Sequence, residues 1–272
     1  MLTSFLTLLL FGCLTGVTTV LFGFGGGFVT VPVVYGSLLA TAHDGAADAM
    51  HVAVATSTAV MVVNAVTATL AQRRAGRLRQ EYVWPLAGFV LLGAALGSLA
   101  ATRLSGGLLH MLFAAYLLVT IADSLLRKGF LAVPDDGPPR PLGRFTTTFG
   151  GVGIGTVAAS LGVGGSVMTV PLLRRRGLPM AAATALANPL SVPVALAGSL
   201  VYALAPAAPA HPGRVGYIGY VDLVACAALL CGSLPTIALV RRLGAHVPDR
   251  LHSAAYVALL ALVLVVMLVT GT

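Results

Sequence analysis

The sequence contains little charge, and this scarcity decides the class of protein. Only 9% of its 272 residues are charged and 58% are apolar, with a mean hydropathy of +0.97. Soluble domains are about 25% charged and about 45–50% apolar, so a water-soluble core does not account for this composition. Continuously apolar stretches of roughly 20 residues, the length that a helix needs to cross a bilayer, recur along the chain. We predict an all-α, polytopic membrane protein with about 8–10 membrane segments in a lipid bilayer.

Several kinds of functional site are missing as well. The three cysteines form no CxxC pair, which argues against a disulfide framework or a zinc site. The net charge of +8 comes from Lys and Arg in short clusters between apolar runs, so we do not expect nucleic-acid binding. A phosphate-binding GxGxxG loop would need glycine at Phe28 and Val167, and no HExxH motif or Ser-His-Asp spacing stands out. We predict no enzyme, no metal and no cofactor.

The chain contains an internal repeat. A shift of 139 residues aligns residues 12–32 with residues 151–171, with eight identities in 21 positions, mostly glycine and proline. A polar, turn-rich stretch separates the two halves. We therefore predict a first transmembrane repeat at residues 1–126, a linker at 127–144 and a second transmembrane repeat at 145–272.

Loop charges predict how the two halves are oriented, because Lys and Arg near helix ends are retained in the cytoplasm. Arginine-rich segments, including the linker, are placed inside; they lie at 72–80, 127–144, 174–176 and 241–250. Segments with at most one Lys or Arg are placed outside; they lie at 41–51, 103–107 and 206–216. The halves then have opposite orientation, with both chain termini external. This predicts an inverted repeat in the inner or plasma membrane.

Each half begins with a glycine-rich interruption of an apolar stretch, at residues 22–27 and 161–166. The second stretch, residues 145–173, would reach only about 43 Å as one helix, which is too short for two crossings of about 30 Å. We expect half-length helices that meet within the bilayer. Inverted repeats with broken helices are typical of secondary transporters, and the free amides at a helix start favour an anion.

The predicted anion site combines these breaks with the polar residues that follow them. Glycine lets a ligand approach the backbone, and hydroxyl or amide groups at membrane depth can bind a polar ligand. The candidates are Gly25, Gly26, Gly27, Thr56, Ser57, Gly164, Gly165, Ser166, Thr184 and Asn188. The alternative is structural: glycines permit close helix crossing, hydroxyls bond back to their own helix, and Asn188 bridges helices.

Other residues have structural interpretations. Gly-xxx-Gly spacings that begin at Gly12, Gly93 and Gly151 predict close helix crossing, and Pro32 and Pro171 are expected to kink or end the half-helices.

Three titratable residues are also interpreted structurally. His51 is the titratable group closest in sequence to Ser57; it either carries a coupling proton or, as we expect, is a wet surface histidine. Asp123 and Asp222 lie near segment ends, which favours interfacial anchoring over a proton relay.

The two motifs resemble a known family. Residues 22–32 read FGFGGGFVTVP, residues 53–57 read AVATS and residues 161–171 read LGVGGSVMTVP. This twofold glycine-rich signature resembles the TauE/SafE sulfite exporter family over nearly the full chain. The resemblance implies transport of sulfite, sulfoacetate and related organosulfur anions, and it points at the candidate residues above other than Asn188. The second half departs from the family pattern at residues 185–188.

These observations predict a secondary transporter, an exporter of small inorganic or organic anions such as sulfite or sulfonates, that works by alternating access. The alternative is a passive anion channel that uses the same helix dipoles. An intramembrane enzyme or assembly scaffold would need a catalytic constellation or a soluble domain. Whether two copies form a homodimer is left open.

Overall fold

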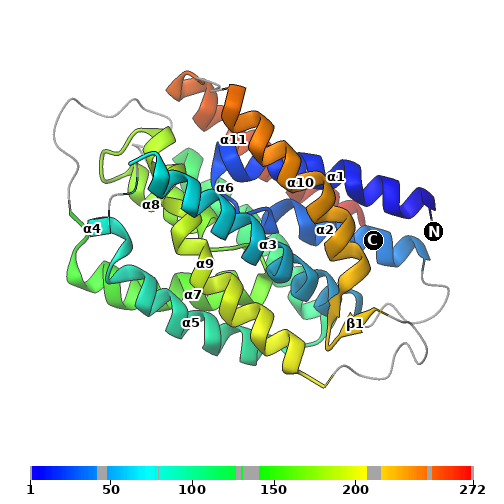
Figure 1. The fold of residues 1–272 in the computed structure, drawn as a ribbon. Helices are drawn as coiled ribbons and strands as arrows, with labels where there is room; N and C mark the ends of the chain where they lie inside the picture. Colours follow the sequence, from blue (N-terminus) through cyan, green and yellow to red (C-terminus); the bar gives the residue numbers. More distant parts are fainter. Residues whose placement is uncertain are drawn as a thin grey trace.

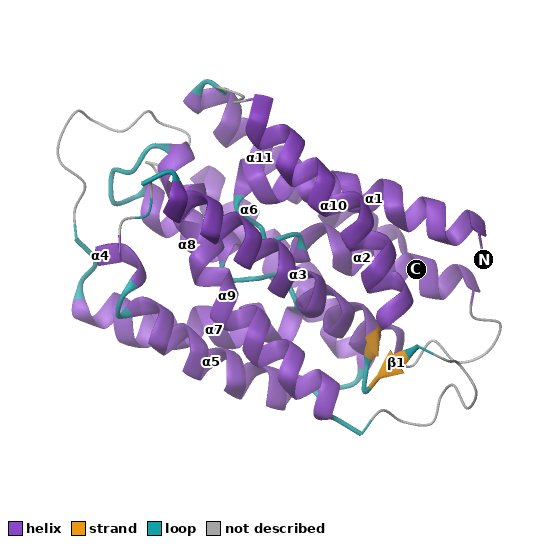
Figure 2. Cartoon of the chain, in the orientation of Figure 1, coloured by secondary structure: helices purple, strands orange, loops and turns teal. Residues whose placement is uncertain are grey.

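The computed structural model describes residues 2–41, 48–76, 78, 80–126, 130, 141–206, 216–243 and 247–270. The helices of the first half are α1 (Leu2–Phe22), α2 (Gly27–Thr41), α3 (Ala49–Arg74), α4 (Gln80–Val83), α5 (Leu86–Ala101) and α6 (Gly106–Leu126). Those of the second half are η2 (Thr146–Gly150), α7 (Gly151–Leu161), α8 (Ser166–Arg174), α9 (Met180–Leu204), α10 (Leu223–Leu243) and α11 (Asp249–Thr270). The described strands, β1 (Tyr217–Ile218) and β2 (Val221–Asp222), form an antiparallel pair beside α10 (Figure 2). Most of the predicted linker lies outside the described residues.

The described helices confirm the prediction of a multi-pass helical membrane protein. Seven spans are long and apolar enough to cross a bilayer, counting Gln80–Ala101 as one. The described helices outside these spans are shorter: α2, α7 and α8 have 15, 11 and 9 residues, and η2, which leads into α7, has 5. At 1.5 Å per residue, α2 and α8 extend only about 22 Å and about 14 Å. Pro32 and Pro171 lie inside these two helices, so neither proline ends its helix.

Helices α3 and α9 form the centre of the molecule. In an apolar 18-residue window of each span, 78% and 72% of the residues of α3 and α9 are buried, against 28–44% in the other spans. Figure 1 shows them between α1, α10 and α11 on one side and α5 and α7 on the other. Polar side chains on α3 and α9 therefore face other helices rather than lipid, where an unpaired polar group is most costly.

The Gly-xxx-Gly spacings lie at close helix crossings, as predicted. A Cβ atom on Gly12 would lie 2.4 Å from the carbonyl oxygen of Leu229, and one on Gly16 would lie 2.7 Å from that of Ser233. The residue four positions later in α1 contacts the residue four positions later in α10, so the two helices run parallel. The same close, parallel contact joins α5 to α7, at Gly93, Gly97, Gly151 and Gly155.

Candidate anion-binding site

Both glycine segments interrupt the helical backbone, as predicted. Gly25 and Gly26 have φ values of +61° and +85°, and Gly162 and Gly164 have +67° and +70°. Only glycine adopts this left-handed region without strain. The chain therefore reverses after α1 and after α7, and a short helix starts anew on the far side of each break.

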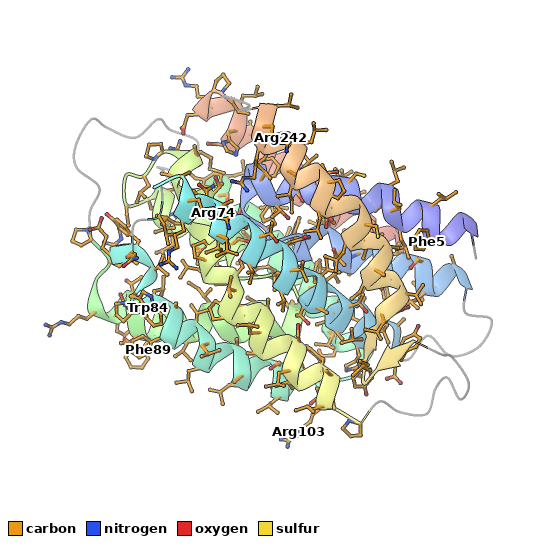
Figure 3. All side chains as sticks on the ribbon, in the orientation of Figure 1. Phe5, Arg74, Trp84, Phe89, Arg103 and Arg242 are labelled. Atoms are coloured by element: carbon orange, nitrogen blue, oxygen red, sulfur yellow. The ribbon has the colours of Figure 1, made fainter. Side chains whose placement is uncertain are left out.

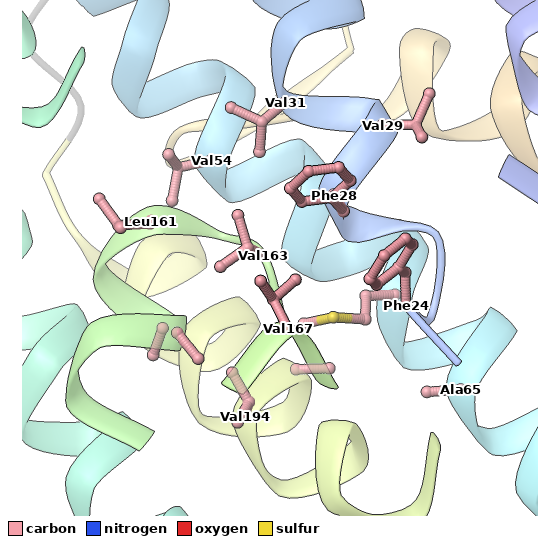
Figure 4. Packing of buried hydrophobic residues seen from close by; sticks show 14 of the residues in the cluster. Phe24, Phe28, Val29, Val31, Val54, Ala65, Leu161, Val163, Val167 and Val194 are labelled. Atoms are coloured by element: carbon pink, nitrogen blue, oxygen red, sulfur yellow. The ribbon is translucent and has the colours of Figure 1, made fainter. Parts of the chain in front are cut away.

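The two breaks meet although they lie far apart in the sequence. A Cβ atom on Gly27 would lie 2.7 Å from the carbonyl oxygen of Gly162, and one on Gly164 would lie 3.4 Å from that of Phe24. Figure 4 shows Phe24 and Phe28 of the first break beside Val163 and Val167 of the second, and all four side chains are buried. The packing leaves the two backbones in direct contact.

Ser57, on the central helix α3, lies between the two breaks. Its hydroxyl oxygen is 2.8 Å from the carbonyl oxygen of Gly27 and 2.7 Å from that of Gly162. A hydroxyl has a single proton, so the two carbonyl groups share one donor. The structure thus places Ser57 against the first break at Gly27 and against the second at Gly162, two residues before Gly164.

The backbone amides at the start of α2 and α8 lack intrahelical acceptors. The first intrahelical bonds run from Thr30 to Gly26, at 3.3 Å, and from Thr169 to Gly165, at 2.9 Å. The amides that precede Thr30 and Thr169 in each helix are the unpaired donors of a helix N-terminus, where the macrodipole is positive. An anion placed there would gain hydrogen bonds that the described backbone does not supply.

Two further predicted residues keep unpaired polar atoms within the described part of the chain. The hydroxyl of Ser166, the first residue of α8, is buried without a hydrogen-bond partner. Asn188 donates from Nδ2 to the carbonyl oxygen of Thr19 at 3.3 Å, while its Oδ1 has no partner. Asn188 therefore bridges α9 to the end of α1, beside the first break.

The remaining two candidates have hydrogen bonds directed elsewhere. The Thr56 hydroxyl accepts from the backbone amide of Asp222 at 3.1 Å, which ties α3 to β2. The Thr184 hydroxyl donates back to the carbonyl oxygen of Ala181 at 3.1 Å. No described contact brings either hydroxyl to the glycine breaks.

Sequence reasoning missed Asn64, which lies on α3 directly beside the first break. Its Oδ1 accepts a 2.9 Å hydrogen bond from the Ser233 hydroxyl, and its Nδ2 has no partner among the described residues. A Cβ atom on Gly26 would lie only 2.6 Å from that Nδ2. A single amide in an apolar membrane helix was the available signal.

The expectation of a wet surface histidine at position 51 is wrong. His51 is only 4% exposed, because its ring stacks on Tyr220 beside the strand pair, at a centroid distance of 5.3 Å. Its Nε2 lies 3.3 Å from the carbonyl oxygen of Ala101. This ring is six residues from Ser57, about 9 Å along the helix axis, so it lies outside the region where the breaks meet.

The two aspartates at segment ends hold helices in place. Asp222 Oδ1 accepts the backbone amides of Val224 and Ala225, both at 2.9 Å, and so caps the start of α10. Asp123, near the end of α6, pairs with Arg175 just after α8.

A buried ion pair fixes the far end of α8. Arg174, which is 1% exposed, pairs with Asp249 at the start of α11. Its Nε donates to the carbonyl oxygen of Phe130 at 3.0 Å. Asp249 also accepts the backbone amide of Met180 at 2.7 Å, so one cluster joins the ends of α8, α9 and α11.

The glycine breaks are enclosed by protein in this conformation. A cavity of about 440 Å³ opens between α1, α2 and α11, with an almost wholly apolar lining that includes Val29 and Pro32. A second, of about 280 Å³, lies beside α4. Neither of these two cavities is lined by a glycine of the breaks, and the glycines of both breaks are buried. Within the described residues, no group of three or more His, Cys, Asp or Glu is placed to hold a metal ion.

Comparison with known proteins supplies independent findings. The family model described as Sulfite exporter TauE/SafE matches residues 8–267. A relative from Haemophilus influenzae, described as "Probable membrane transporter protein", is 30% identical over 179 residues. That alignment covers 65% of this chain, and this chain spans 66% of the relative's length. No solved structure matches the chain.

Proposed function

Because this chain belongs to the sulfite exporter TauE/SafE family, we propose that it is a secondary transporter that exports sulfite, sulfonates or related small anions. The observation that carries the proposal is the meeting of the two breaks at Ser57, whose hydroxyl lies within 2.8 Å of carbonyl groups from both. Two helix N-termini with unpaired amides lie at this junction. An anion is the ligand that such termini favour.

The lengths of the half-helices support a site at membrane depth. From the junction, α2 extends about 22 Å to one side and α8 about 14 Å to the other. The sum is slightly more than the roughly 30 Å of a hydrocarbon core. We propose that the anion reaches the junction alternately from the two sides, as α2 or α8 withdraws from the contact between Gly27 and Gly162.

The packing of the helices supports an inverted repeat. The first helix of each half packs against the other half: α1 lies parallel to α10, and α7 lies parallel to α5. A twofold relation between the halves would produce this arrangement, in which each half packs a helix against the other half in the same way. Figure 3 shows Arg74 and Arg242 toward one end of the molecule and Arg103 at the opposite end. We propose that the Arg74 end and the linker are cytoplasmic and that both termini are external.

Cysteine labelling tests this orientation. Arg103 and Arg242 are both exposed, and each would be replaced by cysteine in a variant without Cys13, Cys226 and Cys231. In intact cells, a membrane-impermeant maleimide should label Arg103→Cys and should label Arg242→Cys only after the membrane is opened. Equal labelling of both positions from outside would contradict the proposed topology.

Transport assays test the function. Proteoliposomes that contain the purified protein should show flux of radiolabelled sulfite or sulfoacetate above protein-free vesicles. Gly27→Leu should abolish this flux because the side chain would enter the contact with Gly162, whereas Gly107→Leu should not, because a Cβ atom there meets nothing within 4 Å. Absence of flux for sulfite, sulfoacetate and acetate with monodisperse protein would refute the proposal.

The passive channel differs from the transporter in one measurable property. A coupled transporter accumulates the labelled anion against its concentration gradient when an ion gradient is imposed, whereas a channel only equilibrates it. Equilibration without accumulation, under imposed proton and sodium gradients in turn, would favour the channel.

A further inference from the structure

Asn64 holds a buried amide group whose N–H donors lack an acceptor. The side chain is 0% exposed, and Nδ2 has no hydrogen-bond partner among the described residues. In the structure the amide is placed with Oδ1 toward the Ser233 hydroxyl, which donates to it at 2.9 Å. The carbonyl side therefore faces α10, and the NH₂ side faces away from it. A buried donor without a partner destabilises the fold, which suggests that something outside the protein satisfies it.

This NH₂ group points at the start of α2. Nδ2 lies 2.6 Å from the position of a Cβ atom on Gly26, the residue directly before α2. The neighbouring Thr15 and Thr19 hydroxyls donate to carbonyl oxygens of their own helix, both at 2.7 Å. The Asn64 side chain and the unpaired amides of the first turn of α2 thus direct N–H donors toward one region.

Among the described residues, no side-chain amide lies at the matching glycine of the second break, where the unpaired side-chain donor beside the glycine is the single hydroxyl of Ser166. Gly165 corresponds to Gly26 in the repeat, and a Cβ atom there would lie 3.7 Å from Cγ2 of Val194 and 3.5 Å from the carbonyl oxygen of Leu190. Figure 4 shows Val194 beneath the second break. A valine methyl group and a carbonyl oxygen offer an anion nothing at the position where Asn64 offers two N–H groups.

We propose that the first break is the anion-recognising half of the site and that Asn64 is the specificity-determining side chain. Its two N–H groups and the first amides of α2 bind the oxygens of a small oxyanion, such as sulfite or the sulfonate head group of sulfoacetate. Ser233 is a positioning residue, since it orients the amide. This inference rests on the proposed transport function. It adds the residue that recognises the anion and states that the two breaks differ in this role.

Binding of sodium sulfite, under anaerobic conditions, and of sodium sulfoacetate to the detergent-purified protein tests the inference by calorimetry. Asn64→Leu keeps the size of the side chain and removes both donors, and Asn64→Asp removes them while adding negative charge. Both variants should weaken binding about ten- to a hundredfold, the range expected for lost hydrogen bonds to a charged group. Ser233→Ala should weaken it less. The matched control, Val194→Ala at the second break, should leave the affinity within about twofold.

Thermal unfolding gives a second readout that a purely structural role would not produce. Without anion, Asn64→Leu should unfold at a higher temperature than the wild type, because an unpaired buried donor is gone. At the same concentration, sulfite should raise the unfolding temperature of the wild type clearly more than that of Asn64→Leu, because the variant binds it more weakly. If Asn64→Leu fails to yield monodisperse protein, Asn64→Asp and Ser233→Ala carry the same comparison.

The possible results distinguish the inference about Asn64 from the transport function on which it rests. If the wild type binds sulfite or sulfoacetate and both Asn64 variants bind it equally well, the inference is refuted while the transport proposal stands. If Val194→Ala loses affinity and the Asn64 variants do not, the second break recognises the anion instead. A wild type that binds neither probe and shows no flux refutes both.

Discussion

Alanine at Gly26 and alanine at Gly165 should have opposite effects on stability, although the repeat makes the two glycines equivalent. Gly26 has φ of +85°, and a Cβ atom there would lie 2.6 Å from Asn64 Nδ2. Gly165 has φ of −69°, and its nearest neighbours would lie at 3.5 Å. The first substitution therefore meets strain and overlap, and the second meets ordinary van der Waals contact.

The magnitudes follow from these geometries. A left-handed conformation costs an L-residue about 1–2 kcal/mol, and overpacking in a tight interior adds about 1–3 kcal/mol. Gly26→Ala should thus lower the free energy of unfolding by about 2–5 kcal/mol. Gly165→Ala should raise it by about 0.4–1 kcal/mol, because alanine restricts the unfolded chain at a position whose backbone it tolerates.

Thermal unfolding in one detergent, with both variants purified in parallel, measures the difference. The expected order of unfolding temperature is Gly165→Ala at or above the wild type, and Gly26→Ala clearly below it. Flux should follow the same order, because the added methyl group lies between Gly26 and Asn64. Equal destabilisation by the two substitutions would show that the neighbours of the two breaks are not as unlike as the structure makes them.

Two further predictions concern the hydroxyl between the breaks and the ion pairs at the end of α8. Ser57→Ala removes the donor that two buried carbonyl groups share and should destabilise the protein by about 1–3 kcal/mol. Thr67→Ala loses only a hydrogen bond to its own helix and should change the unfolding temperature little. Equal effects of the two substitutions in a thermal melt would argue against the bridging role of Ser57. Arg174→Met leaves Asp249 unpaired near a buried site and should cost about 3–5 kcal/mol, while Arg175→Met, from a pair about a quarter exposed, should cost about 1 kcal/mol or less. Similar melts for the two arginine variants would contradict this ranking.

The sequence predicts the features that depend on local pattern. Apolar length identifies the membrane spans, and the glycine runs at residues 22–27 and 161–166 identify the breaks, because each depends on a few consecutive residues. Gly-xxx-Gly spacing marks the contact face of a helix in the same way. It does not name the partner: nothing near Gly12 indicates that Leu229 of α10 lies against it, since that pairing depends on the arrangement of all the helices.

The surroundings of three polar residues could not be predicted from the sequence, and for one physical reason. His51 is covered by Tyr220, and Asn64 is oriented by Ser233, so each environment is created by a residue far along the chain. Thr56 has the hydroxyl that a ligand site favours, but the structure directs it to the backbone of Asp222. Polar side chains in membrane helices find whichever partner the tertiary packing presents, and a single sequence does not reveal that partner.

The proposal that the first break recognises the anion has a consequence for how the anion is released. The backbone donors belong to α2, whereas Asn64 belongs to α3, the most buried span of the molecule. On its outer side, α2 borders the apolar cavity of about 440 Å³ between α1 and α11, which gives it room to move while α3 stays fixed. Such a movement would separate the amides of α2 from Asn64. Affinity would then fall as the path opens, because the open state keeps only part of the donor set, and a tightly recognised anion could still leave.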